Sequence, residues 1–378
     1  MERTRTTKLE RSWIAYDIGN SAFTLLITTL VPLYFNALAK ESGLAPHEYL
    51  AFWGYGQSAT TLIVVFLGPI LGAWADGSGK KKQIFLGTVI IGILIMAAWV
   101  LPTSWLTFLI FFVIARVAYQ ASLIFYDAML VDVTTEDRMD TISSYGFALG
   151  YIGSCVPFIL SLVAILLRDK LGITLKQAMI VAIIVNAVWW LLFTLPLAKD
   201  YQQPHYVTNS DVKVTNVFVR LWQTLKMVTR DKKVLLFLLA FFFYIDGVST
   251  IISMSVSYGD SIGLGATTLL IALLVTQIVA FPFAILFGYL AKKVSNAVLI
   301  EICIVGYFLI TLFAVQLDKN WEFFFLAICV GIFQGGIQAL SRSYFARLIP
   351  KDRSSECFAL YDIFAKGETS HIQPIGLG

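Results

Sequence analysis

Charged residues stand inside apolar segments of this sequence, where hydrocarbon would leave them without a partner. Asp17 and Asp246 each begin a polar stripe within a long apolar run, and Arg116 lies about halfway along another. An ionised side chain at the centre of a bilayer is costly unless it meets water, a counter-ion or a ligand. Such residues could bind a polar solute or exchange a proton. No HExxH or P-loop pattern occurs, and no catalytic or metal-binding constellation is expected.

Two polar stripes have the spacing of a single helical face. Their members are Asp17, Asn20, Ser21, Thr24 and Thr28 in the first run, and Asp246, Ser249, Thr250, Ser253 and Ser257 in the seventh. We expect both stripes to face a central, water-filled pathway. The alternative is that the hydroxyls and Asn20 join helices together, while Asp17 reaches the nearby membrane interface.

Arg116, Gln120 and Asp127 share one face of the fourth run, because they follow at spacings of four and seven residues. We predict that Arg116 binds a substrate carboxylate, or pairs with an intramembrane aspartate when the site is empty. The alternative is a permanent ion pair that only orients the helices.

A second amide-bearing face comes late in the chain, where Gln334, Gln338 and Ser341 follow helical spacing. The two glutamines could bind a polar substrate or hydrogen-bond across helices, and both interpretations stay open. Arg342 and Arg347 occupy positions that correspond to Asp127 and Asp132 in the repeat described below. We expect these opposite charges to close an inner gate through ion pairs.

The elements that must position these residues are membrane helices. Hydrophobic residues make up 58% of the 378 residues, charged residues only 14%, and the mean hydropathy is +0.78. Ten apolar runs are long enough to span hydrocarbon, at about 13–37, 50–75, 83–102, 105–131, 142–167, 177–198, 234–257, 266–291, 296–316 and 321–346. The expected fold class is therefore all-α and integral to the membrane. The net charge of +4 does not imply a nucleic-acid partner.

Most of the 28 lysines and arginines lie in loops that a cytoplasmic N-terminus would place inside the cell. Matching residues recur in the two parts of the chain: Gly72 with Gly288, and Glu136-Asp137-Arg138 with Lys351-Asp352-Arg353. The repeat predicts two parallel six-helix halves, residues 1–198 and 234–366, joined by a cytoplasmic linker at 199–233. In this scheme the eleventh helix is broken, the twelfth is missing, and residues 367–378 form an aberrant polar tail. A C-terminally truncated chain is therefore expected.

The turn between the second and third runs reads Gly72-Ala-Trp-Ala-Asp76-Gly-Ser-Gly79-Lys80-Lys81-Lys82. Its glycines permit close helix packing and a sharp reversal, and its lysines favour the cytoplasmic side. This turn resembles the signature loop of the major facilitator superfamily, although Gly77 stands where that superfamily usually has Arg or Lys. In the superfamily the loop, with its aspartate, packs against the start of the eleventh helix.

Two further segments are similar to the vacuole-effluxer branch of the superfamily, which includes the fungal autophagy-associated amino-acid effluxers. They are Trp13-x-x-Tyr16-Asp17-x-x-Asn20-Ser21-Ala22-Phe23 and Gln334-Gly335-Gly336-x-Gln338-Ala339-Leu340-Ser341-Arg342-Ser343. Tyr126-Asp127-Ala128 and Asp246-Gly247-Val248 fit the same branch.

The resemblance implies a secondary active transporter that works by alternating access and exports a small polar or zwitterionic solute such as an amino acid. It implies no enzyme and no cofactor. The expected partners are the solute, the bilayer and a coupling proton, and the chain is expected to act as a monomer in a bacterial plasma membrane. The alternatives are a membrane scaffold or sensor, a membrane enzyme acting on lipid, and an inactive truncated transporter.

Overall fold

Every regular element in the part of the chain that the structure describes is a helix. The computed structural model describes residues 5–101, 104–207, 214–261, 265–316 and 319–365. The long helices are α1 (Lys8–Glu41), α2 (Pro46–Ser78), α3 (Lys81–Ala97), α4 (Trp105–Ala128), α6 (Met139–Leu166), α8 (Leu175–Asp200), α10 (Lys232–Ser261), α11 (Ala266–Leu290), α12 (Asn296–Ala314) and α13 (Asn320–Leu348). The other helices are η1 (Ala98–Val100), α5 (Leu130–Val133), α7 (Arg168–Leu171), α9 (Val214–Arg230), η2 (Lys351–Arg353) and α14 (Ser354–Ala365).

The ten predicted apolar runs are confirmed as helices long and apolar enough to cross a membrane. Their outer faces carry large apolar side chains, such as Leu94 on α3 and Phe308 on α12, which are 63% and 62% exposed. In water such surfaces would drive association, whereas in lipid they are the ordinary exterior of a helix bundle.

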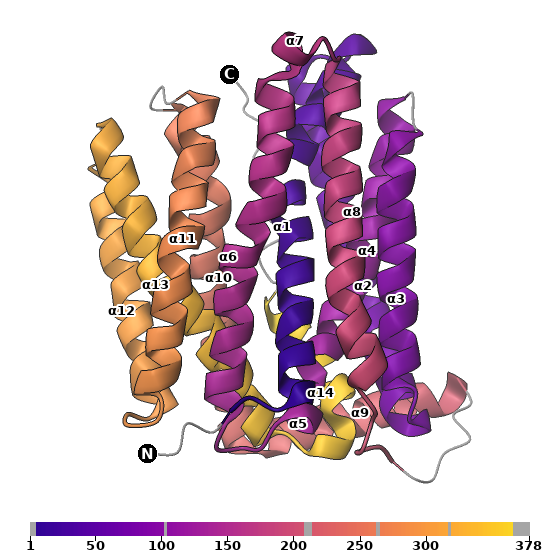
Figure 1. The fold of residues 1–378 in the computed structure, drawn as a ribbon. Helices are drawn as coiled ribbons and strands as arrows, with labels where there is room; N and C mark the ends of the chain where they lie inside the picture. Colours follow the sequence, from indigo (N-terminus) through magenta and orange to yellow (C-terminus); the bar gives the residue numbers. More distant parts are fainter. Residues whose placement is uncertain (1–4, 102–103, 208–213, 262–264, 317–318, 366–378) are drawn as a thin grey trace.

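The long helices run side by side, and α9 lies across one end of the bundle (Figure 1). That end also carries the start of α1 and residues Lys80–Lys82, and we call it the basic end. The helix α1 lies against α6 and α8, α4 lies against α2 and α3, and α13 lies against α11 and α12. Contacts between α6 and α11 join the first group of helices to the later one.

The first residues of α1 form hydrogen bonds that hold the start of this helix at the basic end. Thr7 Oγ1 accepts a hydrogen bond from the Glu10 amide (3.1 Å), and Glu10 Oε2 accepts from the Thr7 amide (2.7 Å), which forms a capping box. The same carboxylate accepts two hydrogen bonds from Arg138, at 2.9 and 2.7 Å. The cap of α1 is therefore tied to the segment that precedes α6.

The linker predicted at 199–233 is not an irregular loop throughout, because α9 occupies Val214–Arg230 within it. Polar residues are frequent in this helix, so its sequence lacks the long apolar run that revealed the other helices. Thr224 and Val228 are buried against the bundle, whereas Trp222 is 68% exposed. The division into two six-helix halves stays a prediction.

The segment predicted as a broken eleventh helix is helical as α14 over Ser354–Ala365, and it lies against α2 and α4. The predicted break after Lys366 and the predicted tail at 367–378 lie outside the described residues.

Candidate functional site

The side chain of Arg342, from α13, reaches in among α1, α4 and α6. Its Nε donates to Ser143 Oγ, Nη1 to Asp127 Oδ1 and Nη2 to the Ser143 carbonyl oxygen, each at 3.0 Å. Nη2 also lies 3.4 Å from Asp17 Oδ2. Every guanidinium nitrogen thus has a partner, and one buried cation is compensated by two carboxylates.

Three aromatic rings surround the same guanidinium. Its Cζ atom lies 4.1 Å from the ring centroid of Phe147, 4.7 Å from that of Trp13 and 5.4 Å from that of Tyr126. Trp13 Nε1 donates to the Tyr126 carbonyl oxygen at 2.9 Å, which holds two of the rings in place. A planar guanidinium can stack on rings while its edge donates hydrogen bonds, and an ammonium group cannot.

Gly146 on α6 leaves the space that this arrangement needs. A Cβ atom at Gly146 would lie 2.7 Å from Asp17 Oδ2 and 3.1 Å from Arg342 Nη2. Since neither charged group can move away without losing its partner, any side chain at this position would disturb the ion pairs.

Arg347 lies further toward the basic end of α13 and forms a different pair. It contacts the carboxylate of Asp140 at the start of α6, and its Nε donates to the Glu136 carbonyl oxygen at 3.2 Å. Asp140 also accepts hydrogen bonds from Ser343 Oγ (2.6 Å) and Asn296 Nδ2 (2.7 Å). Of the two acids expected to face the gate arginines, only Asp127 does so.

The other acid, Asp132, sits in a buried cluster with Lys81. Lys81 Nζ lies 2.9 Å from Asp132 Oδ2 and donates to Ser354 Oγ at 2.8 Å, and both charged side chains are 0% exposed. Tyr201 Oη donates to Asp132 Oδ2 (2.7 Å), and His205 Nδ1 lies 2.8 Å from Oδ1. Burial, and next the charge of Asp132, raises the pKa of Tyr201 well above its usual value. This cluster joins four segments at the basic end.

Asp76 binds the first turn of α14, because its Oδ2 accepts a hydrogen bond from the Glu356 amide at 2.9 Å. A carboxylate here satisfies an amide that has no partner within its own helix. Gly72, one turn earlier, allows the approach, since a Cβ there would lie 2.7 Å from the Ser355 carbonyl oxygen. Gly79 ends α2 with φ 63°, in the left-handed region, and Lys80 lies over the exposed ring of Trp74 at 5.6 Å.

The polar stripe of α1 is largely bonded within the protein. Asn20 Nδ2 lies 3.4 Å from Asp17 Oδ1, and Thr24 Oγ1 lies 2.6 Å from Tyr119 Oη. Ser21 faces Gly150 of α6, where an added Cβ would lie 2.6 Å from its Oγ. The stripe therefore faces helices α4 and α6, and Asp17 is its link to Arg342.

Other predicted site residues keep buried polar atoms that no hydrogen bond satisfies. These atoms are Arg116 Nε and Gln120 Oε1 on α4 and Asp246 Oδ1 on α10. Arg116 lies near the ring of Phe112, at 5.8 Å, and within the described residues no acid forms an ion pair with it. Among the described residues, Asp17 and Asp127 pair with Arg342 and not with Arg116, and Asp246 forms no ion pair with Arg116 either. Ser249, one turn after Asp246, is half-buried.

The two glutamines of α13 have different surroundings. Gln338 Oε1 accepts a hydrogen bond from Tyr151 Oη of α6 at 2.6 Å. Gln334 is buried and lines a small cavity with Thr276 and Gln277 of α11. Gln338 thus connects α13 with α6, as the helix-joining alternative described.

Sequence reasoning missed several members of these groups. Ser143 and the aromatic rings around Arg342 carry no sign of their role, since serines and aromatics are frequent in any membrane helix. Gln57 of α2 also has a buried amide oxygen without a partner. A search for every amide within the apolar runs would have found Gln57.

A family model described as "Vacuole effluxer Atg22 like" matches residues 5–378. The chain belongs to the Atg22-like vacuole effluxer family. The chain is also 43% identical, over 367 residues, to the MFS-type transporter YxiO of Bacillus subtilis (strain 168). This match covers 96% of the chain and 86% of YxiO.

Fungal relatives of this Atg22-like chain are more distant. Autophagy-related protein 22-1 of Neosartorya fischeri is 24% identical over 272 residues, which cover 65% of this chain and 44% of the fungal protein. The chain thus matches less than half the length of that relative. The family match includes residues 367–378, which the structure does not describe, and truncation stays a prediction.

Solved structures of major facilitator transporters share the fold of the Atg22-like chain. The human organic anion transporter MFSD10 has a TM-score of 0.67 at 12% identity, covering 96% of this chain and 91% of that chain. The proton:xylose symporter XylE has a TM-score of 0.65 at 10% identity, covering 95% and 84%. The Atg22-like chain is therefore a multi-pass membrane transporter of the major facilitator superfamily and not an enzyme.

Proposed function

We propose that this transporter is secondary active, works by alternating access and exports a small zwitterionic solute such as an amino acid. The observation that carries the proposal is a guanidinium and a carboxylate that keep unsatisfied atoms within the bundle. Arg116 Nε on α4 and Asp246 Oδ1 on α10 are buried without a hydrogen-bond partner. Buried polar atoms are normally paired, so one unsatisfied atom on each of two oppositely charged groups favours a ligand that supplies both partners.

An amino acid has the required complementarity. Its carboxylate would bind Arg116, and its ammonium group would bind Asp246, while the amide oxygens of Gln57 and Gln120 offer further acceptors. A solute bound between α4 and α10 would contact a helix from each predicted half. Such binding between repeats is the usual arrangement in transporters with internal repeats.

The pairs made by Arg342 and Arg347 would form the gate at the basic end. Alternating access requires these pairs to break when the pathway opens at that end. Protonation of Asp127 or Asp17 would remove charge that compensates Arg342, and so weaken the gate. A proton is therefore the coupling ion that we propose.

We also propose in which membrane the transporter lies and how it is oriented there. The distribution of lysines and arginines supports a cytoplasmic N-terminus. The similarity to a Bacillus transporter supports a bacterial plasma membrane, and the name of the matching family, an effluxer, supports export. We propose that a monomer performs the transport.

The test is solute flux in proteoliposomes that contain the purified chain. We expect uptake of labelled amino acids above that of empty liposomes, and dependence on a proton gradient. Arg116→Lys and Asp246→Asn should each slow zwitterion flux by about tenfold or more, since a hydrogen bond to a charged group is worth roughly 1.5–3 kcal/mol. The matched control is Arg168→Lys on the exposed turn α7.

The outcomes separate the alternatives. Wild-type flux in Arg116→Lys would exclude Arg116 as the carboxylate clamp. Absence of flux for every solute in a folded, reconstituted protein would favour a scaffold or sensor, or an inactive truncated transporter. Restored flux in a version carrying two further apolar spans would distinguish the truncated transporter from the scaffold.

A further inference from the structure

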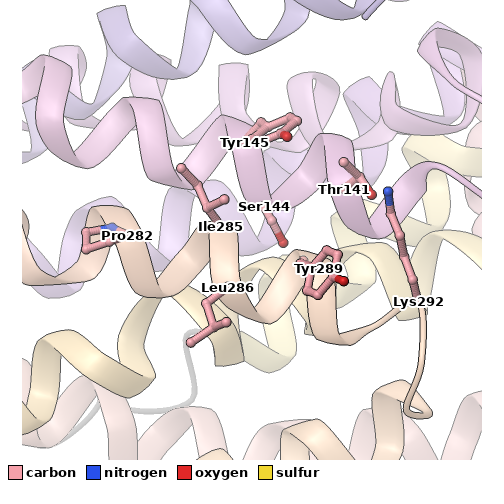
Figure 2. Close-up of a pocket in the computed structure, with 9 residues that line it drawn as sticks. Thr141, Ser144, Tyr145, Pro282, Ile285, Leu286, Tyr289 and Lys292 are labelled. Atoms are coloured by element: carbon pink, nitrogen blue, oxygen red, sulfur yellow. The ribbon is translucent and has the colours of Figure 1, made fainter. Parts of the chain in front are cut away.

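A crevice opens between α6 and α11 near the basic end of the bundle (Figure 2). Its polar lining consists of Thr141, Ser144 and Tyr145 from α6 and of Tyr289 and Lys292 from α11 and the turn after it. All of these side chains can donate hydrogen bonds, and no acidic residue is among those that line the crevice. The crevice is therefore suited to an anion.

Ser144 supplies an independent sign of a ligand. Its residue is 1% exposed, yet its Oγ atom has no hydrogen-bond partner. Gly288 of α11 lies opposite, so close that an added Cβ would be 2.5 Å from Ser144 Cβ. Figure 2 shows the Ser144 hydroxyl directed toward the α11 side chains that line the crevice. A buried hydroxyl without a partner is a donor available to a bound group.

Lys292 supplies the charge. It is exposed, and no acid in the described part of the chain forms an ion pair with it. The neighbouring Lys293 instead lies over the ring of Tyr289, at 5.1 Å. Lys292 is thus the lysine of this pair that lines the crevice.

The rest of the lining is apolar and faces outward. Pro282, Ile285 and Leu286 continue from the polar groups along α11, and Leu286 is 44% exposed. On a membrane-spanning helix, an exposed apolar side chain is in contact with lipid. The crevice therefore has cationic and hydroxyl groups at the end of the helix and an apolar groove toward the centre of the bilayer.

We propose that this crevice binds an anionic phospholipid of the adjoining leaflet. The phosphate lies against Lys292 and the hydroxyls, and an acyl chain lies along Ile285 and Leu286. Basic pockets between membrane helices bind anionic headgroups in this way. The lipid contacts both α6 and α11, which belong to different predicted halves, so it stabilises the close approach of these helices. The proposal is independent of the identity of the transported solute.

Native mass spectrometry of the full chain tests the proposal. The protein is incubated with phosphatidylglycerol or phosphatidylcholine of identical acyl chains. We expect preferential retention of phosphatidylglycerol, and a decrease of about fivefold in Lys292→Gln, the effect of one lysine beside an anionic surface. Ser144→Ala should also lower retention. The matched control, Lys293→Gln, should retain the lipid as the wild type does.

Three results would overturn the proposal. The first is equal retention of phosphatidylcholine and phosphatidylglycerol, and the second is unchanged retention of phosphatidylglycerol in Lys292→Gln. The third is displacement of the lipid by an equal concentration of glycerol phosphate, which would assign the site to a free phosphate. Thermal unfolding of each variant without added lipid checks that it is folded.

Discussion

Arg342 Nη1 lies 3.0 Å from Asp127 Oδ1, across 215 positions of the chain. The two residues occupy corresponding places in the predicted repeat, on α13 and α4. The contact therefore joins α4 to α13 at two positions that the predicted repeat places in correspondence. Asp17, 3.4 Å from Nη2, adds the leading helix to this contact.

Removing the charge of Asp127 should weaken its ion pair with Arg342 and so favour opening of the bundle at the basic end. A charge-assisted hydrogen bond contributes about 1.5–3 kcal/mol, so Asp127→Asn should raise the population of the open form by roughly tenfold. The measurement is labelling by an impermeant maleimide of a single cysteine placed at Ser21. The matched control is Asp137→Asn, because Asp137 is an exposed acid of the nearby turn. Equal labelling of Asp127→Asn and wild type would contradict this role.

Gly72→Val should separate α2 from α14. The added Cβ would lie 2.7 Å from the carbonyl oxygen of Ser355, and backbone cannot move aside cheaply. Overpacking of this kind destabilises by about 1–3 kcal/mol. We expect a lower Tm in detergent than for Gly54→Ala on the same helix, where an added Cβ meets nothing within 4 Å. If the two variants had the same Tm, the close contact would not hold α14.

Lys81→Met should be strongly destabilising. It leaves the carboxylate of Asp132, which is 0% exposed, without its cation, and breaking one side of a buried pair costs about 3–5 kcal/mol. Lys82→Met, on the adjacent and less buried position, is the control for loss of positive charge in the turn. The comparison uses thermal unfolding, and similar losses in both variants would argue against a special role for Lys81.

The stabilisation by Tyr201 should disappear at high pH. Its pKa is raised in the folded protein, so the folded state holds the phenolic proton more tightly than the unfolded state. This stabilisation is complete below the usual pKa of about 10 and is lost as pH rises toward the folded pKa. Tyr201→Phe should therefore have a lower Tm at pH 8, and the difference from wild type should shrink above pH 10.

A constant Tm difference between pH 8 and pH 11 would show that the Tyr201 hydroxyl contributes nothing that depends on its proton. Tyr206→Phe is the control, because Tyr206 is 45% exposed.

Hydrophobic pattern predicted the ten spans, because each membrane helix must satisfy its own backbone and present apolar side chains to lipid. It missed α9, where helical periodicity is present but the long apolar run is not. The predicted repeat pointed to Arg342 and Asp127 as residues of an ion-paired gate, and the two side chains lie 3.0 Å apart. It could not assign Arg347 to Asp140 or Lys81 to Asp132, because such choices depend on which helix ends meet in three dimensions.

The burial of Lys81 has a practical consequence for anyone who wishes to add a tag or a rigid fiducial domain. The lysine-rich turn looks like a free surface loop in the sequence, yet an insertion beside Lys81 would pull apart four joined segments. The turn at Gly172 is the better site. There φ is 65°, an added Cβ meets nothing within 4 Å, and the preceding α7 has no buried residue.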